Sequence, residues 1–170
     1  LLNPVGLDGT ESLVGVSNPA FGGNLNELVH EEQFWALRMA TQRYQPQDVR
    51  YGSLALAVLW PRVSAATRWP RQGGWGMWDL RAVWQEFSER GSVRGPTDAV
   101  PSDQGRSEVG TLCALMELAP NESLTVPFIL AWNFPNRVND WNNEPEVRGK
   151  VMRNYYSTWF KDAWAVAKYA

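Results

Sequence analysis

Apolar and polar residues alternate with a period of two over several segments of this chain, which is the pattern of pleated strands. Residues 33–41 (QFWALRMAT), 51–60 (YGSLALAVLW) and 62–69 (RVSAATRW) predict three strands. The second and third are expected to be neighbouring strands joined around Pro61, at a point where a strand does not need a backbone N–H.

The strongest local signal is a pair of apolar segments, residues 109–118 and 123–134, separated by the turn-forming tetrapeptide APNE. This arrangement predicts an antiparallel hairpin. The second segment then runs without a turn signal into Asn133, Phe134 and Arg137, whose amide, aromatic and guanidinium groups a core strand does not need. That change of character indicates that the strand end meets another layer or domain.

Two segments depart from the two-residue period and predict helices. From Leu80 to Phe87 the apolar residues fall at i, i+3, i+4 and i+7, with Asp79 placed as N-cap and Gly91 after the last turn. Asp162 is the predicted N-cap of a second helix, which runs to the end of the chain.

The remaining long segments are predicted to be loops. Residues 1–33 are rich in Gly, Asn and Pro, so we expect a long ordered loop with a functional or interface role. Residues 92–108 are expected to form a polar loop that faces solvent. Together the elements predict a mainly β fold, an antiparallel β-sandwich with one inserted helix and one terminal helix, rather than alternating βαβ units.

Composition narrows the function classes. Apolar residues make up 44% of the 170 residues and the formal net charge is -2, which is typical of a soluble globular protein and argues against a nucleic-acid partner. No apolar run approaches the roughly 20 residues of a membrane span.

The single cysteine, Cys113, excludes an internal disulfide and is expected to be a small buried residue. One thiol and no visible export signal favour a cytoplasmic location. Because the chain begins with Leu1 rather than Met and its last helix lacks a capping residue, we expect a piece of a larger protein.

The ten tryptophans stand out, and two interpretations of them remain open. Tryptophan fills the cores of large sandwiches and the interfaces between domains. It also stacks on the C–H faces of sugars, so one or two of these residues could face a carbohydrate ligand.

A search for catalytic chemistry finds none. No two carboxylates form a convincing pair for glycosidic hydrolysis, because the acidic residues cap helices or lie in polar loops. The only histidine, His30, has no nucleophile motif near it, and one His with one Cys makes a transition-metal site improbable. The GGWG turn at residues 73–76 lacks the Lys of a phosphate-binding loop. The residues alone therefore predict a non-catalytic β-sandwich without catalytic, cofactor-binding or metal-ligating residues.

Several blocks together resemble a known family. In order, NPVGLDG, NPAFGGNLNE, YGSLALAV, VSAATRWP, GGWGMWDLRAVWQEFSERG, PFILAWNFPNR and YYSTWFKDAWAVAKYA resemble the amino-terminal domain of the bile-acid β-glucosidase, or non-lysosomal glucosylceramidase, family of glycoside hydrolases (family 116). The LAW-x-FP strand end and the YY-x-x-WF-x-D-A entry into a helix are the most specific parts.

The resemblance implies a large enzyme in which a β-sandwich packs against a carboxy-terminal (α/α)6 barrel. Members cleave β-glucosides, in some cases the sphingolipid glucosylceramide, with retention, and their Glu nucleophile and Asp acid/base belong to the barrel. Residues 1–155 would then be the sandwich, in part, and residues 156–170 the start of a linker helix toward the barrel. No catalytic residue carries over to this chain, no cofactor is implied, and the β-glucoside would bind in the barrel.

The resemblance also suggests a role for the strand end. Trp132, Phe134 and Arg137 are predicted to help form the contact with the barrel, as is the loop from Phe21 to Asn26. Two other hypotheses remain open: a free-standing carbohydrate-binding module that uses surface tryptophans, and a purely structural interaction domain.

Overall fold

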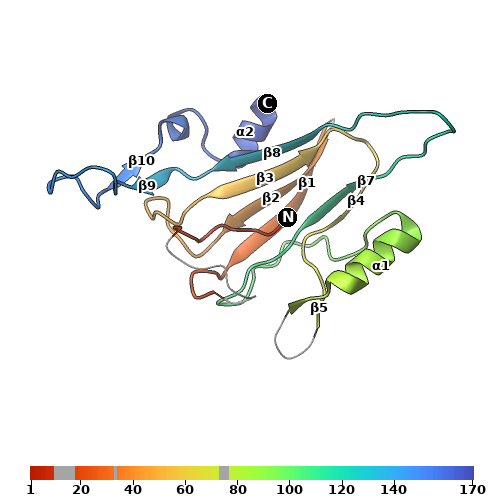
Figure 1. The fold of residues 1–170 in the computed structure, drawn as a ribbon, viewed down its shortest axis with the longest axis horizontal. Helices are drawn as coiled ribbons and strands as arrows, with labels where there is room; N and C mark the ends of the chain where they lie inside the picture. Colours follow the sequence, from red (N-terminus) through yellow and green to blue (C-terminus); the bar gives the residue numbers. More distant parts are fainter. Residues whose placement is uncertain (10–17, 33, 73–76) are drawn as a thin grey trace.

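The computed structural model describes residues 1–9, 18–32, 34–72 and 77–170, and its centre is a four-stranded antiparallel sheet (Figure 1). The strands are β1 (Asn24–Glu31), β2 (Phe34–Thr41), β3 (Ser53–Val58) and β8 (Phe128–Asn133), in the spatial order β1-β2-β3-β8. The predicted strands at residues 33–41 and 51–60 are thus confirmed as β2 and β3, which pair from Trp35 opposite Val58 to Ala40 opposite Ser53.

A second, smaller layer covers one face of this sheet. It is formed by β4 (Val63–Ala66), which pairs with β7 (Thr111–Ala114), while β5 (Arg71–Gln72) and β6 (Met77–Trp78) make a separate short pair. The core between the layers gathers apolar side chains from β2, β3, β7 and the N-terminal segment: Val5, Leu37, Met39, Leu54, Val58 and Leu112. The two layers confirm the predicted mainly β, sandwich-like fold.

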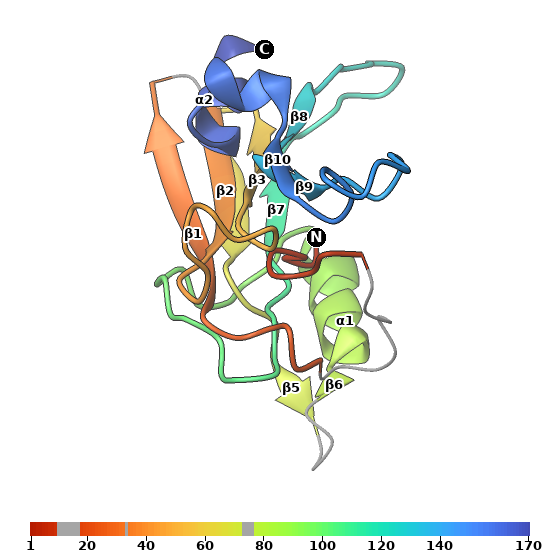
Figure 2. The same ribbon diagram turned by 90° about the vertical axis from the view of Figure 1, so that its left-hand side faces the viewer.

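The opposite face of the central sheet carries the C-terminal helix α2 (Ala163–Tyr169), which contacts β3 and β8 (Figure 2). Ala55 and Ala131 on the sheet face Ala163 and Ala167 on the helix, and all four are buried. Alanines leave room for the helix to approach the sheet closely. The predicted N-cap is confirmed, because the Asp162 side chain accepts a hydrogen bond from the backbone N–H of Ala165 at 2.7 Å.

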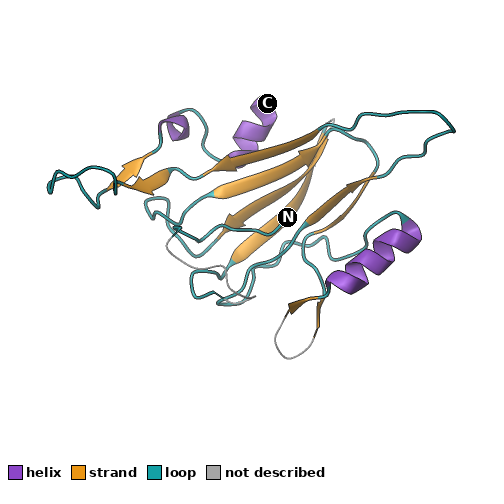
Figure 3. Cartoon of the chain, in the orientation of Figure 1, coloured by secondary structure: helices purple, strands orange, loops and turns teal. Residues whose placement is uncertain are grey.

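The inserted helix is also confirmed, as α1 (Leu80–Arg90), which Figure 3 shows well separated from α2. Asp79 caps it by accepting from the backbone N–H of Ala82 at 2.9 Å, and Gly91 ends it with a φ of 64°, a left-handed value that favours glycine. None of its residues is buried, and Leu80 and Trp84 are 63% and 65% exposed. Its apolar stripe therefore remains open to solvent.

The predicted hairpin is wrong. β7 pairs with β4 and β8 pairs with β3, so the two apolar segments belong to different layers. The APNE tetrapeptide does turn, with Asn121 at a φ of 65°, but residues 115–127 form a long connection without strands. Alternation predicts which face of a strand is buried, and it does not predict the partner strand.

The predicted neighbours around Pro61 are corrected for the same reason. β3 lies in the central sheet and β4 in the second layer, so the chain crosses from one layer to the other at this proline. A single turn signal is equally compatible with a hairpin and with a crossing between layers.

The predicted loop at residues 1–33 contains a strand. β1 has the sequence NLNELVHE, and its buried positions include Asn24 and Asn26, which are 0% and 2% exposed. Their side chains donate hydrogen bonds to the carbonyl oxygens of Val5, at 2.6 Å, and Thr67, at 2.8 Å. Asparagine is uncommon in strands, so the sequence pattern concealed β1. Residues 10–17 of that loop and the GGWG turn at residues 73–76 lie outside the described residues.

Two smaller expectations are corrected. The polar loop faces solvent from residue 94 to residue 101, but Ser102 and Ser107 are buried. Ser102 Oγ accepts a hydrogen bond from the backbone N–H of Asn24 in β1, and the Ser107 hydroxyl donates to the carbonyl oxygen of Asn3. Cys113 is half-buried rather than buried, because β7 lies at an edge of the second layer and one side of the strand remains open.

Candidate interdomain surface

The strand end singled out by the sequence lies where β8 leaves the sheet. The chain bends after Asn133 into β9 (Asn136–Val138), which pairs with β10 (Val151–Arg153), and continues into the short 3-10 helix η1 (Tyr155–Thr158). Figure 1 shows β9 and β10 projecting beyond the end of the central sheet, in the direction away from β7. This end of the molecule therefore combines segments from residue 132 to residue 159.

Phe134 packs inward at this bend. Its half-buried ring rests against the main core, directly over Gly52, where an added Cβ would lie 2.2 Å from the Phe134 Cδ1. The Phe134 carbonyl accepts hydrogen bonds from the Tyr156 hydroxyl, at 2.6 Å, and from Asn154 Nδ2, at 2.7 Å. Phe134 therefore anchors the bend, and a direct contact of its ring with another domain stays a prediction.

The asparagines explain why amide groups follow a core strand. Asn133 is 2% exposed, and its Nδ2 donates to the carbonyl oxygen of Phe160 at 2.9 Å, just before α2 begins. Asn136 is 8% exposed, and its Nδ2 donates to the carbonyl oxygens of Pro46 and Asp48, both at 2.8 Å. These bonds give the buried side-chain amides their partners and tie the strand end to the loop at residues 46–48 and to the segment before α2. The amides fix the chain path into β9 and α2.

The other two predicted residues face outward. Trp132 is 57% exposed, and the Arg137 guanidinium lies 4.4 Å from the centre of the Trp141 ring, a cation–π contact at the surface. In η1 and just after it, Tyr155 and Trp159 form an edge-to-face pair with ring centres 5.2 Å apart. We call Trp132, Arg137, Trp141, Tyr155 and Trp159 the aromatic end.

The aromatic end has the composition of an interface. Its four aromatic residues are all more than half exposed. Aromatic residues and arginine are enriched in protein interfaces. Sequence reasoning identified Trp132 and Arg137 but missed Trp141, Tyr155 and Trp159. The signal for Tyr155 and Trp159 was their place in a motif dense in aromatic residues, YYSTWF.

Among the described residues, no group of three or more His, Cys, Asp or Glu side chains could hold a metal ion. His30, near the end of β1, is exposed and stacks on Trp35 with ring centres 4.2 Å apart. The Arg68 guanidinium donates hydrogen bonds to both carboxylate oxygens of Asp98 and holds the pKa of that carboxyl below its usual value. Asp98 is thus an ion-pair partner and not a proton donor near neutral pH.

No helix in the described ranges is both long and apolar enough to span a membrane.

The model of the family described as "beta-glucosidase 2, glycosyl-hydrolase family 116 N-term" matches residues 2–170. None of the curated proteins matches the chain.

Proposed function

Because the chain belongs to glycosyl hydrolase family 116, as part of its amino-terminal domain, we propose that it is the non-catalytic β-sandwich portion of a retaining β-glucosidase. The substrates of the whole enzyme would be β-glucosides, glucosylceramide among them. The catalytic carboxylates would lie in a following (α/α)6 barrel.

The proposal rests on two features: the exposed aromatic residues of the aromatic end, and the helix α2 that follows them in the chain. Residues 156–170 would lead toward the barrel, and their helix α2 is fixed to the central sheet through Ala163 and Ala167. A following domain would therefore be held close to Trp159, which is 69% exposed; Trp132, also exposed, lies at the end of β8 on the face of the sheet opposite to α2. In this arrangement the aromatic end contacts the barrel.

The proposal is tested in the full-length enzyme with the variants Trp132→Ala and Trp159→Ala. Buried interface tryptophans are among the residues that contribute most, so each variant should weaken the contact by about 2 kcal/mol, lower the melting temperature and reduce hydrolysis of an aryl β-glucoside. Trp84→Ala is the matched control, because Trp84 is similarly exposed, at 65%, but lies on α1, which Figure 1 shows at the other end of the molecule from β9 and β10.

Two outcomes would contradict the proposal. One is that deletion of residues 1–155 leaves the rate of aryl β-glucoside hydrolysis unchanged, which would show that the sandwich does not support catalysis. The other is that Trp132→Ala and Trp159→Ala behave like the Trp84→Ala control in both assays. A free-standing carbohydrate-binding module would give the second result and would bind sugar without any partner domain.

A further inference from the structure

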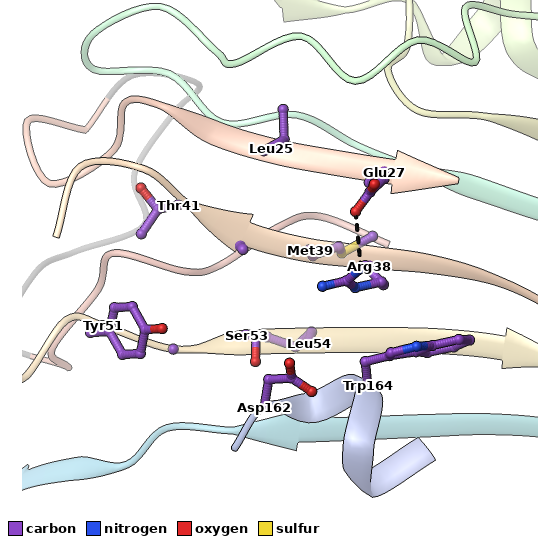
Figure 4. Close-up of a pocket in the computed structure, with 12 residues that line it drawn as sticks. Leu25, Glu27, Arg38, Met39, Thr41, Tyr51, Ser53, Leu54, Asp162 and Trp164 are labelled. Atoms are coloured by element: carbon purple, nitrogen blue, oxygen red, sulfur yellow. Dashed lines mark ion pairs between the residues drawn. The ribbon is translucent and has the colours of Figure 1, made fainter. Parts of the chain in front are cut away.

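A polar cavity of about 210 Å³ opens on the α2 side of the central sheet (Figure 4). This space is many times what one water molecule needs. Side chains from β1, β2, β3 and the start of α2 line it, together with Tyr51 just before β3. The groups with hydrogen-bonding or stacking capacity are Glu27, Arg38, Tyr51, Ser53, Asp162 and Trp164.

One side of the cavity is an ion pair on the sheet surface. Glu27 and Arg38 face each other across β1 and β2, with Arg38 Nη1 3.3 Å from Glu27 Oε2. Their side chains are 44% and 40% exposed, and an ion pair at that exposure adds little to stability. The guanidinium retains N–H groups, and the carboxylate retains lone pairs, that can reach a ligand.

The opposite side presents two polar groups in fixed positions. Asp162 Oδ1 accepts from Ala165 N at 2.7 Å, and Ser53 Oγ accepts from Ala163 N at 2.9 Å. Within the described residues, Asp162 Oδ2 and the Ser53 hydroxyl hydrogen have no protein partner. Because the helix cap already holds both side chains, a ligand that binds them need not immobilise them.

Aromatic rings close the two ends of the cavity in Figure 4, with Tyr51 at one end and Trp164 at the other. Trp164 is half-buried, and its ring is supported by Phe34 at a centroid distance of 5.3 Å. Aromatic faces attract the weakly positive C–H groups of a sugar ring. The Tyr51 hydroxyl adds a donor and acceptor at the rim.

The balance of charges selects the ligand class. Glu27 and Asp162 carry two negative charges against the positive charge of Arg38. Lys168 Nζ also lies 5.7 Å from the centre of the Trp164 ring, but it is paired with Glu31 at 3.3 Å, so the balance stays negative and phosphate, sulfate and carboxylate ligands are disfavoured. A neutral ring with several hydroxyl groups matches the mixture of donors, acceptors and aromatic surface. We propose that this cavity binds one pyranose ring of a neutral sugar, as a site on the sandwich separate from any catalytic centre. This inference does not depend on the proposed function.

The test uses a signal local to the cavity, in the intact protein labelled with 5-fluorotryptophan. The ¹⁹F resonance of Trp164 is the one missing from the Trp164→Phe variant, and Trp84 provides a reference resonance elsewhere. Titration with methyl β-D-glucoside should shift the Trp164 resonance to saturation, with a Kd on the order of 1–10 mM for a ligand of this size. The Trp84 resonance should stay in place.

Two conservative variants and one control test whether the shift of the Trp164 resonance comes from binding of the glucoside in the cavity. Tyr51→Phe removes only a hydroxyl and should raise the Kd about 5-fold, and Arg38→Gln should raise it about 10-fold. Arg62→Gln is the control, because Arg62 is paired with Glu117 at 3.6 Å on another part of the surface and should leave the Kd unchanged.

Several results would overturn the proposal. They are a Trp164 resonance that does not saturate with the glucoside, equal shifts of the Trp164 and Trp84 resonances, and a Kd that Tyr51→Phe and Arg38→Gln leave as it is. A Trp164 shift produced by choline chloride and not by the glucoside would also overturn it, because the negative balance of the cavity would then have selected a cation. Sugar binding confined to a catalytic domain would leave Trp164 unmoved and would likewise count against this site.

Discussion

The contact between Gly52 and Phe134 predicts a specific destabilisation when a single methyl group is added. In Gly52→Ala the new Cβ would lie 2.2 Å from Phe134 Cδ1, 2.7 Å from its Cε1 and 3.0 Å from the Asn133 carbonyl oxygen. Such distances require the ring to move. Overpacking of this kind costs about 1–3 kcal/mol, and here it displaces the residue that anchors the bend after β8.

The assay is urea-induced unfolding of the wild type, Gly52→Ala, Phe134→Ala and the double variant. Truncating Phe134 removes the atoms nearest to the new methyl group, so Gly52→Ala should cost less than about 0.5 kcal/mol in the Phe134→Ala background. The coupling free energy of this cycle should therefore be about 1–2 kcal/mol. Only the contact with the Asn133 carbonyl oxygen would remain.

Gly91→Ala is the control for the general effect of replacing a glycine. Gly91 has open space around its Cα but a φ of 64°, so its substitution costs about 1 kcal/mol through backbone strain alone. That cost should be the same with Phe134 and with Ala at position 134. Equal costs of Gly52→Ala in the two backgrounds would refute the reasoning, because the penalty would then not come from the Phe134 ring.

Three further predictions concern polar groups. Asn136→Ala removes two hydrogen bonds of 2.8 Å from a buried amide to the carbonyl oxygens of Pro46 and Asp48, and it should lower the free energy of unfolding by about 1–2 kcal/mol in urea unfolding. A loss below about 0.5 kcal/mol would contradict the role given to this amide. Asp162→Ala removes the N-cap of α2 and should cost about 1 kcal/mol, with Asp162→Asn retaining most of the stability in the same assay. Because Arg68 lowers the pKa of Asp98 below 3.8 in the folded state, this carboxylate stabilises the fold above that pH and loses its contribution as the pH falls through the lowered pKa. Asp98→Asn should accordingly flatten the acid side of the melting-temperature profile, and an unchanged profile would show that the pair has no effect.

The sequence predicted elements better than it predicted their partners. Capping residues carry local information, and so Asp79, Gly91 and Asp162 located both helices. Strand pairing depends on distant residues, and so the partners of β7 and β8 were wrong. β1 was missed because two of its inward positions are asparagines, which become compatible with a core only through hydrogen bonds that the fold itself provides.

The candidate site shows the same division between local and distant information. The change of residue types after Trp132 falls where β8 ends, at Asn133, and a contact of this strand end with another domain stays a prediction. The separate roles of Phe134, which packs inward, and Arg137, which stacks on Trp141, could not be predicted because they depend on Gly52 and on the β9–β10 connection. The polar cavity beside α2 has no sequence signature at all, since its groups come from residue 27 to residue 164.

The side chains of β8 support the proposal that another domain covers this edge. Ala131, under α2, is buried, whereas Phe128, Leu130 and Trp132, on the face that continues the sandwich core, are 51%, 49% and 57% exposed. The register places them directly opposite Val58, Leu56 and Leu54, which line that core. A strand that buries its small side chains and leaves three large ones in water gains little from its own domain, because stabilisation scales with apolar area removed from water at about 25 cal/mol per Å². A partner that covers Leu130 and Trp132 would remove this apolar surface from water, whereas Phe128, at the other end of β8, lines a groove with Trp84 of α1 and lies outside this contact. The proposed catalytic barrel, approaching the aromatic end from the side of Trp132, would cover Leu130 and Trp132.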